Sequence, residues 1–376
     1  MKLVYLDHAA TSWPKPDSVP DAVREAVLRA GGNPGRGSHP LSNAAAELLY
    51  EAREETASFF GGAPERTVFT PGATWSLNTA IRGLAPPGCR ILYDNFSHNA
   101  VLRPVRAMTD TGFCTAGVYD ASGDDGEIMA ALRDSLTPDT AMVIATHQSN
   151  ICSHILPIRK IGQFCREHGL IFVVDGAQTA GHLPISMEED GIDALCLPGH
   201  KGLLGLPGAG ILLLSGRFPC RPLAYGGAGI LSLEPGMPEE LPERLEPGTL
   251  PLPAIASVQA GIRTVRKYGI ERISRWENAL SRMFRAGLSS AGRYRTVGAA
   301  GGSVVSILHE RLTPAQVGGA LAERGICVRT GYHCAPLAHR TLGTARQGTV
   351  RISFGPSVRP TDIERILNVL NEIDEF

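Results

Sequence analysis

The chain has 376 residues, more than one hydrophobic core usually spans, so a large domain with a smaller companion is expected. Its 36 basic and 37 acidic residues give a formal net charge of −1, which argues against nucleic acids or anionic membranes as partners. The eight cysteines show neither CxxC pairs nor metal-ligand spacing. This usage predicts neither a disulfide framework nor a metal site, and it favours a reducing cytoplasm.

Export and membrane insertion are not expected. The N-terminal stretch reaches Asp7 and His8 before an apolar segment can develop, so it does not resemble a signal peptide. The most apolar run, GLLGLPGAGILLL, is short and contains Pro207, so no membrane span is predicted.

Between residues 15 and 250, short β-rich runs alternate with amphipathic helical patterns. The expected strands are RTVFTPG, RILYDNF, TAMVIATH, LIFVVDGA, IDALCLPG and GAGILLLS. The expected helices are TWSLNTAIRGL, NAVLRPVRAMTD, EIMAALRDSL and IRKIGQFCREHG. Nearly continuous apolar strands separated by helices predict an α/β fold with a mainly parallel sheet covered on both faces. In such sheets, ligands bind beyond the carboxyl ends of the strands.

After residue 250 the pattern changes to that of a smaller α/β domain. Two long helices are expected at 252–269 and 270–290, followed by the strands SVVSILHE, GICVRTG and TVRISFG and a last helix. The TPAQ sequence predicts a helix start, with Thr313 as N-cap and Gln316 at the third position. We therefore expect a large domain over 15–250 and a small domain over 251–376, with segment 1–14 packing near the small domain.

Polar side chains follow two neighbouring strands of the predicted sheet. Asp175 ends the strand LIFVVD, with Gln178 three residues on, and His200-Lys201 follow the next strand inside a glycine-rich turn. A lysine at such a strand end is partly desolvated, which is typical of lysines that form Schiff bases. Each residue alone also fits a surface turn or a helix cap. Together they indicate the lysine and the pyridinium partner of a pyridoxal phosphate site.

A phosphate site is predicted where the first strand of this sheet meets its helix. In FTPGATWSLN, Ala73 and Thr74 open a helix whose amides and hydroxyl can hold an anion. His98, after the strand RILYDNF, is positioned to stack on an aromatic ring, although a histidine there can equally cap a helix.

A cysteine in a polar loop is a further candidate for the active site. VRTGYHCAP places Cys334 after His333, between Gly331 and Pro336, where a buried structural cysteine is not expected. Cationic neighbours, Arg329 and His333, are expected to favour its thiolate, which is the nucleophilic form of the side chain.

Eight motifs occur in the order and spacing of the class-V aminotransferases of pyridoxal phosphate (PLP) fold type I. They are YLDHAAT, GATWSLN, SHNAV, HQSN, VDGAQTAG, PGHKG, EPGT and RTGYHCAP. The last motif resembles the cysteine desulfurase and selenocysteine lyase branch, and the resemblance runs from Tyr5 to the C-terminus.

The resemblance implies a role for each matching residue. Lys201 would bind the cofactor covalently, Asp175 would pair with its pyridine nitrogen, and His98 would stack on its ring. Asn150 and Gln178 would contact the pyridine O3′, with Asn150 also near the substrate. The phosphate would be held by Ala73, Thr74 and His200, and across a homodimer interface by Thr249 of the other subunit. The substrate would contact Arg351 through its α-carboxylate, for which a guanidinium fork is suited, and His39 in GRGSHPLS.

The implied reaction converts L-cysteine to L-alanine, with Cys334 taking the sulfur as a persulfide for an acceptor protein. Such sulfur mobilisation serves processes such as iron–sulfur cluster assembly. Two alternatives remain: a selenocysteine lyase or another class-V lyase or transaminase, and a catalytically inactive scaffold. Retention of Lys201, Asp175, His98, Arg351 and Cys334 argues against a scaffold.

The chain also departs from the family pattern. Pro198 stands where a serine usually precedes Gly-His-Lys, which removes a phosphate hydroxyl ligand, and Trp75 replaces a residue that is usually polar. The stretch LAHRTLGTARQG, between Cys334 and Arg351, is the chain's own.

Overall fold

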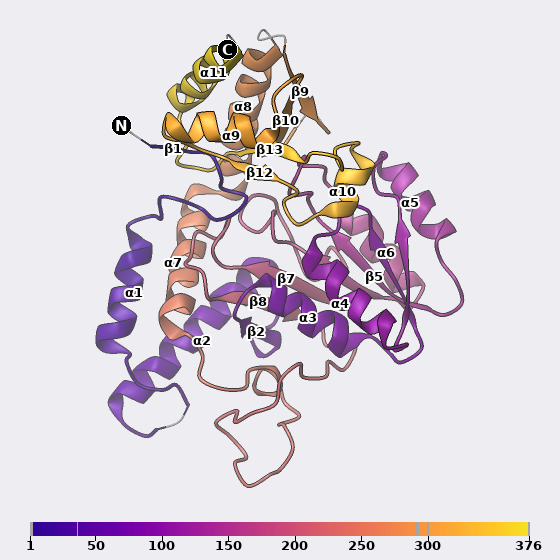
Figure 1. Cartoon of the computed structure of the whole chain (residues 1–376). Helices are drawn as coiled ribbons and strands as arrows, with labels where there is room; N and C mark the ends of the chain where they lie inside the picture. The colour runs from indigo at the N-terminus through magenta and orange to yellow at the C-terminus, as the bar shows by residue number, and fades with distance from the viewer. Residues whose placement is uncertain (1–2, 36, 290–292, 299–300, 375–376) are drawn as a thin grey trace.

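The computed structural model describes residues 3–35, 37–289, 293–298 and 301–374. Within them, seven strands form the largest of three sheets. Their order across the sheet is β2-β8-β7-β6-β5-β3-β4. The sheet lies in the lower part of the view in Figure 1. The bounds are β2 Thr67–Thr70, β3 Arg90–Asp94, β4 Thr115–Tyr119, β5 Thr140–Thr146, β6 Ile171–Asp175, β7 Ala194–Pro198 and β8 Gly210–Leu214. β8 alone runs antiparallel to the other six strands, so the predicted mainly parallel sheet is confirmed.

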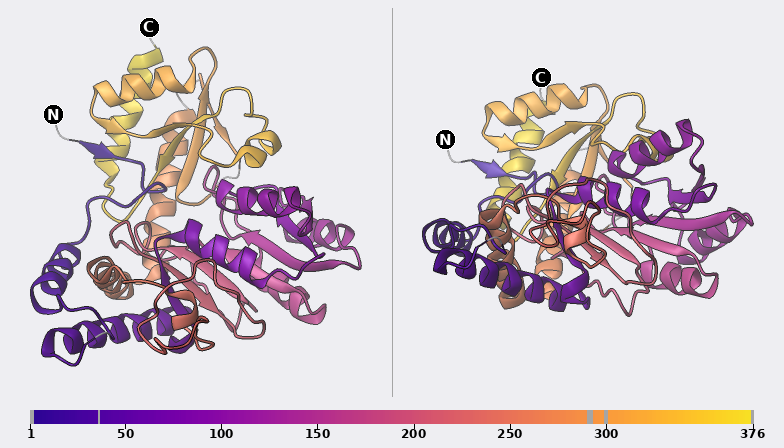
Figure 2. Two further views of the ribbon diagram at one scale, coloured as in Figure 1. Left: turned by 60° about the horizontal axis from the view of Figure 1, so that its bottom comes forward. Right: turned by 90° about the horizontal axis from the view of Figure 1, so that it is seen from below.

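Both faces of this sheet are buried, as the continuous apolar strands predict. In β6, Ile171 and Val173 join one hydrophobic core, and Phe172 and Val174 join the core on the opposite face. Helices cover both faces (Figure 2). The helices of the chain up to Tyr268 are α1 Ser18–Arg29, α2 Pro40–Phe60, α3 Ala73–Leu84, α4 Asn99–Asp110, α5 Asp125–Asp134, α6 Ile158–Glu167 and α7 Leu252–Tyr268, with short 3-10 turns at Pro64–Arg66 and Glu243–Leu245.

A four-stranded antiparallel sheet in the order β12-β13-β10-β9 forms the smaller part of the chain. The strands are β9 Tyr294–Val297, β10 Val304–His309, β12 Arg329–Gly331 and β13 Thr349–Ser353, and the helices are α8 Ile270–Ser289, α9 Pro314–Glu323, α10 Pro336–Thr341 and α11 Pro360–Asp374. The predicted cap of α9 is confirmed: Thr313 Oγ1 accepts from Gln316 N, and Gln316 Oε1 accepts from Thr313 N.

The expected strand GICVRTG is interrupted at Val328, and its two halves join different sheets. The first half, β11 (Ile326–Cys327), pairs in parallel with β1 (Val4–Tyr5), whereas β12 pairs with β13. The N-terminal segment therefore lies beside the smaller part of the chain, and Leu6 is buried in its core.

Helix α7 ties the Lys201 turn to the N-terminal helices, because it packs on α1 and α2 and contributes Ile255 and Val258 to a core of the large sheet. A Cβ atom at Gly261 would lie 1.9 Å from the Leu203 carbonyl oxygen, so only glycine permits this contact. The boundary at residue 250 stays a prediction, since the chain just after it still packs on the large sheet. Among the described residues, no helix combines the length and apolarity needed to cross a bilayer.

Candidate active site

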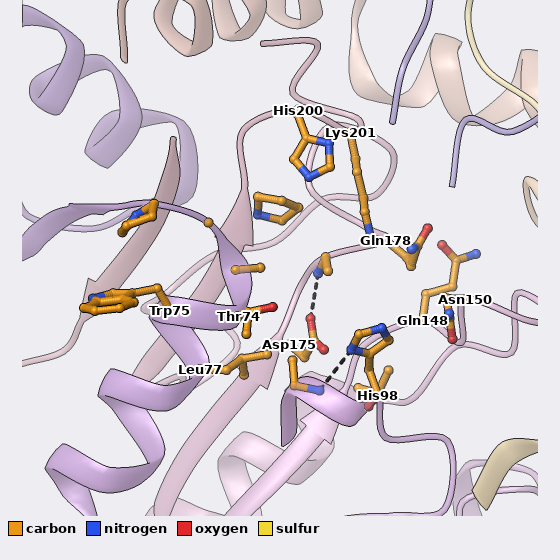
Figure 3. A pocket seen from close by; sticks show the side chains of 17 residues that line it. Thr74, Trp75, Leu77, His98, Gln148, Asn150, Asp175, Gln178, His200 and Lys201 are labelled. Carbon is orange, nitrogen blue, oxygen red and sulfur yellow. Dashed lines mark hydrogen bonds between the residues drawn. The ribbon is translucent and has the colours of Figure 1, made fainter. Parts of the chain in front are cut away.

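A cavity of about 370 Å³ lies beyond the carboxyl ends of the central parallel strands. Figure 3 shows side chains from separate strand ends and from the start of α3 converging on it. The predicted site residues that line it are Ala73, Thr74, His98, Asn150, Asp175, Gln178, His200 and Lys201. The sheet topology thus brings together residues spread over about a third of the chain.

Asp175 and Lys201 are the central pair of this cavity. Burial raises the pKa of the Asp175 carboxyl, against the effects of the Ala177 amide at 3.0 Å and of Lys201. Burial also lowers the pKa of Lys201 to about 8, although Asp175 opposes this shift. A lysine with this pKa is partly neutral near physiological pH, so its amine can act as a nucleophile.

The N-terminus of α3 and His200 form the side of the cavity that is suited to an anion. Ala73 and Thr74 open the helix, and Nδ1 of His200 is buried without a hydrogen-bond partner. Trp75 and Pro198, the two departures from the family pattern, also line the cavity. Backbone amides and an unpartnered ring nitrogen suit a phosphate group.

The N-terminal segment fixes the His200–Lys201 peptide. The His200 carbonyl accepts from Lys15 Nζ at 2.9 Å, Thr11 Oγ1 at 3.0 Å, and both the amide and the hydroxyl of Ser12 at 3.0 and 3.2 Å. Gln178 Nε2 donates to the Ala9 carbonyl at 3.1 Å. The start of the chain therefore helps to position Lys201 and Gln178.

His98 is neutral and held in a fixed orientation. It is the N-cap of α4, and its Nδ1 accepts from the Ala100 amide at 3.0 Å. Burial is the main cause, and the charge of Lys201 the second, of a His98 pKa lowered to about 4, so the ring is neutral. Because Nδ1 accepts a hydrogen bond, the proton of the neutral ring lies on Nε2. The histidine thus caps a helix and lines the cavity at the same time.

Arg351 lies behind the cavity-lining residues and is 1% exposed. Nη2 pairs with Asp7 Oδ1 at 2.8 Å, Nη1 donates to the Asn150 carbonyl at 3.2 Å, and Nε is buried without a partner. Burial lowers the pKa of the guanidinium, while Asp7 opposes the shift. A buried guanidinium with spare donors next to Asn150 can receive a carboxylate.

Cys334 lies in the turn between β12 and α10, as predicted, and its side chain is exposed. Its carbonyl accepts from the Asn99 amide at 2.7 Å, and the preceding carbonyl, of His333, accepts from Asn150 Nδ2 at 2.7 Å. His333 and Cys334 have φ values of 47° and 59°, a conformation that costs energy in residues other than glycine. The hydrogen bonds from α4 and Asn150 hold the turn in this conformation.

The expectation that His333 favours a thiolate at Cys334 is wrong. The His333 ring is buried, with Nε2 3.0 Å from Thr349 Oγ1. Burial is the main cause, and the charge of Arg351 the second, of a His333 pKa lowered to about 2, so the ring is neutral. A neutral ring carries no positive charge that would stabilise a thiolate, and Arg329 is the remaining cationic neighbour from that prediction.

Besides Arg351 and Cys334, two more predicted residues, Thr249 and His39, lie outside the cavity lining. Thr249 precedes α7 and its hydroxyl accepts from Asn33 Nδ2 at 3.4 Å, while His39 is exposed as the N-cap of α2. Their roles stay predictions, and that of Thr249 requires a second copy of the chain.

Sequence reasoning gave no role to two residues of the site. Asp7 pairs with Arg351, and its place in the YLDHAAT motif is the only feature of the sequence that could have pointed to it. Gln148, in HQSN, lines the cavity and its Oε1 is buried without a partner.

The chain belongs to the class-V aminotransferase family, whose profile (Aminotransferase class-V) matches residues 4–366. It is similar to proteins named probable cysteine desulfurase. The identity is 32% to that of Aeropyrum pernix (99% of this chain, 94% of the relative) and 30% to that of Methanothermobacter thermautotrophicus (98% and 94%). The solved apo structure of a cysteine desulfurase from Thermococcus onnurineus NA1 superposes with a TM-score of 0.91 at 30% identity, covering 99% of this chain and 95% of that one. The fold is thus PLP fold type I.

Replacing Asp7 with asparagine should destabilise the protein, because it leaves the buried Arg351 guanidinium without its carboxylate. Breaking a buried ion pair costs about 3 kcal/mol or more, and the lower end applies because the Asp7 side chain is 19% exposed. Urea unfolding measures the loss. Asp134→Asn, at an exposed end of α5, is the matched control and should change the free energy of unfolding by less than about 0.5 kcal/mol. Equal stability of Asp7→Asn and wild type would contradict the importance of the pair.

Proposed function

We propose that the protein is a PLP-dependent cysteine desulfurase that converts L-cysteine to L-alanine and takes the sulfur onto Cys334. The observation that carries the proposal is the buried Asp175–Lys201 pair in a cavity next to the Arg351 guanidinium. The names of the relatives support the same activity.

The cavity fits pyridoxal phosphate in size and in chemistry. Its volume of about 370 Å³ is in the range of small cofactor pockets. The buried Asp175 carboxylate suits a protonated pyridine nitrogen, and the lysine amine suits the aldehyde. The start of α3, with the unpartnered Nδ1 of His200, suits the phosphate. When bound, the cofactor withdraws electrons from the substrate Cα and makes its proton acidic.

The protein's own groups bind and orient the substrate. Arg351 would hold the α-carboxylate through the donors that Asp7 and Asn150 leave free. Lys201 Nζ, whose pKa is about 8, can take up and return a proton inside the cavity. The neutral His98 adds no further positive charge beside it.

Sulfur leaves by thiolate attack. The Cys334 thiolate attacks the substrate sulfur, the substrate Cβ–S bond breaks, and a proton returns to Cβ. The sum is L-cysteine plus the Cys334 thiol giving L-alanine plus a Cys334 persulfide, in which carbon is reduced and sulfur oxidised without an external reagent. A sulfur-acceptor protein would then remove the persulfide, and a homodimer would bring Thr249 to the partner's phosphate.

Attachment of pyridoxal phosphate to Lys201 should depend on pH. Only the neutral amine attacks an aldehyde, so the attachment rate should rise through about pH 8 and level off above it, as absorbance after mixing apo-protein with cofactor will show. Borohydride should then fix the cofactor on Lys201, and Lys201→Arg should prevent this. Asp175→Asn should move the midpoint to lower pH, because Asp175 raises the pKa of Lys201. A midpoint near 10.5 in wild type would contradict a desolvated amine.

Arg351→Ala should lower kcat/KM for L-cysteine by roughly tenfold to a thousandfold, because a charge-assisted fork to the carboxylate is lost. Cofactor attachment should persist, since Arg351 lies outside the cofactor cavity lining. Comparison with Asp7→Asn separates the two effects: both variants disturb the ion pair, but only the alanine variant loses the carboxylate receptor. Unchanged kcat/KM in Arg351→Ala would mean that another cation binds the carboxylate.

Cys334→Ala should abolish most alanine formation from L-cysteine while leaving the cofactor attached. Cys327→Ala is the matched control, because Cys327 lies in β11 of the same segment and should not matter. Wild type treated with L-cysteine should gain one sulfur atom on Cys334, visible by intact mass and removed by a reductant. Full activity of Cys334→Ala would favour a lyase that releases sulfur directly.

A further inference from the structure

Two segments that are close to Cys334 carry arginines and no acidic residue. Residues 324–361 hold six arginines without an aspartate or glutamate, and residues 95–109, which include most of α4, hold two more and no acidic residue. These arginines are Arg103, Arg106, Arg324, Arg329, Arg340, Arg346, Arg351 and Arg359. In a chain with a net charge of −1, this is a local excess of positive charge.

Hydrogen bonds place these two segments beside the cysteine. The Asn99 amide of α4 donates to the Cys334 carbonyl at 2.7 Å. Tyr332 Oη donates to the Arg346 carbonyl at 3.2 Å, which brings that part of the chain back to within two residues of Cys334. Arg340 lies on α10, the short helix that directly follows the cysteine turn.

Some of these arginines already have carboxylate partners, and others do not. Arg351, Arg106 and Arg324 pair with Asp7, Asp110 and Glu372. Within the described part of the chain, Arg103, Arg340 and Arg346 are exposed and form no ion pair. One acid, Asp120, is linked to α10 by hydrogen bonds: Asn95 Nδ2 donates both to Asp120 Oδ1 and to Thr341 Oγ1 at the end of that helix.

We propose that Arg103, Arg340 and Arg346, here called the arginine surface, dock the acidic face of the protein that takes sulfur from Cys334. This inference rests on the proposed function. Tyr332 is 49% exposed beside the cysteine and adds an aromatic contact, and tyrosine and arginine are both enriched in protein interfaces. Unpaired surface cations attract an acidic partner over several ångströms and set its orientation on the encounter.

The transfer itself needs no further reagent. A thiolate of the acceptor attacks the outer sulfur of the Cys334 persulfide, the sulfur–sulfur bond breaks, and Cys334 leaves as a thiolate. Because Cys334 is exposed, the acceptor's thiol can approach it from the surface, and the arginine surface favours acceptors with acidic residues around that thiol.

Synthetic peptides test this preference. Holoenzyme is loaded with L-cysteine, freed of excess, and mixed with peptides of equal length whose single cysteine is flanked by glutamates, serines or lysines. Mass spectrometry follows the sulfur gained by each peptide, and rates are divided by the thiolate concentration. At low salt the glutamate peptide should react about tenfold faster than the lysine peptide. The difference should nearly vanish at 1 M salt, where the screening length is about 3 Å.

Variants assign the preference to the arginines. Arg340→Gln with Arg346→Gln should reduce the difference to about twofold or less, whereas the matching lysine variants should keep it. The control is Arg24→Gln with Arg311→Gln, two exposed arginines on α1 and before α9. Alanine formation with dithiothreitol as acceptor should be unchanged in all of them.

Three results would overturn the inference: equal rates for the three peptides, a preference for lysine, or a glutamate preference that survives the glutamine variants. If Cys334 gains no sulfur from L-cysteine before any peptide is added, the proposed function fails first and the docking surface fails with it. The loading step therefore separates the two failures.

Discussion

The ion pair between Arg351 and Asp7 holds together three segments that are distant in sequence. The guanidinium belongs to β13, its carboxylate partner to the N-terminal segment, and its carbonyl partner to Asn150 of the segment after β5. Next to it, Ser353 Oγ accepts from the Ala9 amide at 2.9 Å. A buried cation is tolerable only with such partners, so the smaller sheet can sit against the cavity only when the N-terminal segment is in place.

Positive charge in the site exceeds what the protein itself neutralises. Besides burial, Arg351 and Arg329 lower the pKa of Lys201, and Arg329 lowers that of Arg351. Asp175 and Asp7 act in the opposite direction on Lys201, and Asp7 does so on Arg351. The neutral state of His98 and His333 keeps this excess from growing. A site with this balance suits ligands that bring two anionic groups, a phosphate and a carboxylate. The positive charge adds to burial, the main cause, in lowering the pKa of the Lys201 amine.

Sequence patterns predicted the features that depend on residues close together in the chain, such as strand ends and helix caps. Apolar strands ending in Asp175 and Lys201 had to place both groups at one edge of a parallel sheet, and Thr313 had to cap its helix. The patterns missed β4 and β9, since short edge strands with exposed positions lack a continuous apolar signal. The break at Val328 and the burial of His333 depend on contacts with β1, β13 and Thr349, which lie far away in the sequence.

The cysteine turn depends both on its own residues and on contacts with distant segments. Its unfavourable backbone conformation at His333 and Cys334 is held by hydrogen bonds from the Asn99 amide and the Asn150 side chain. Asn99 follows His98, and Asn150 also accepts, through its carbonyl, from Arg351. The thiol is thus positioned by segments that line the cavity and that contact Arg351. Under the proposed function, such a turn would fix the thiol relative to the substrate, and an acceptor would have to approach the protein surface at this turn to collect the sulfur.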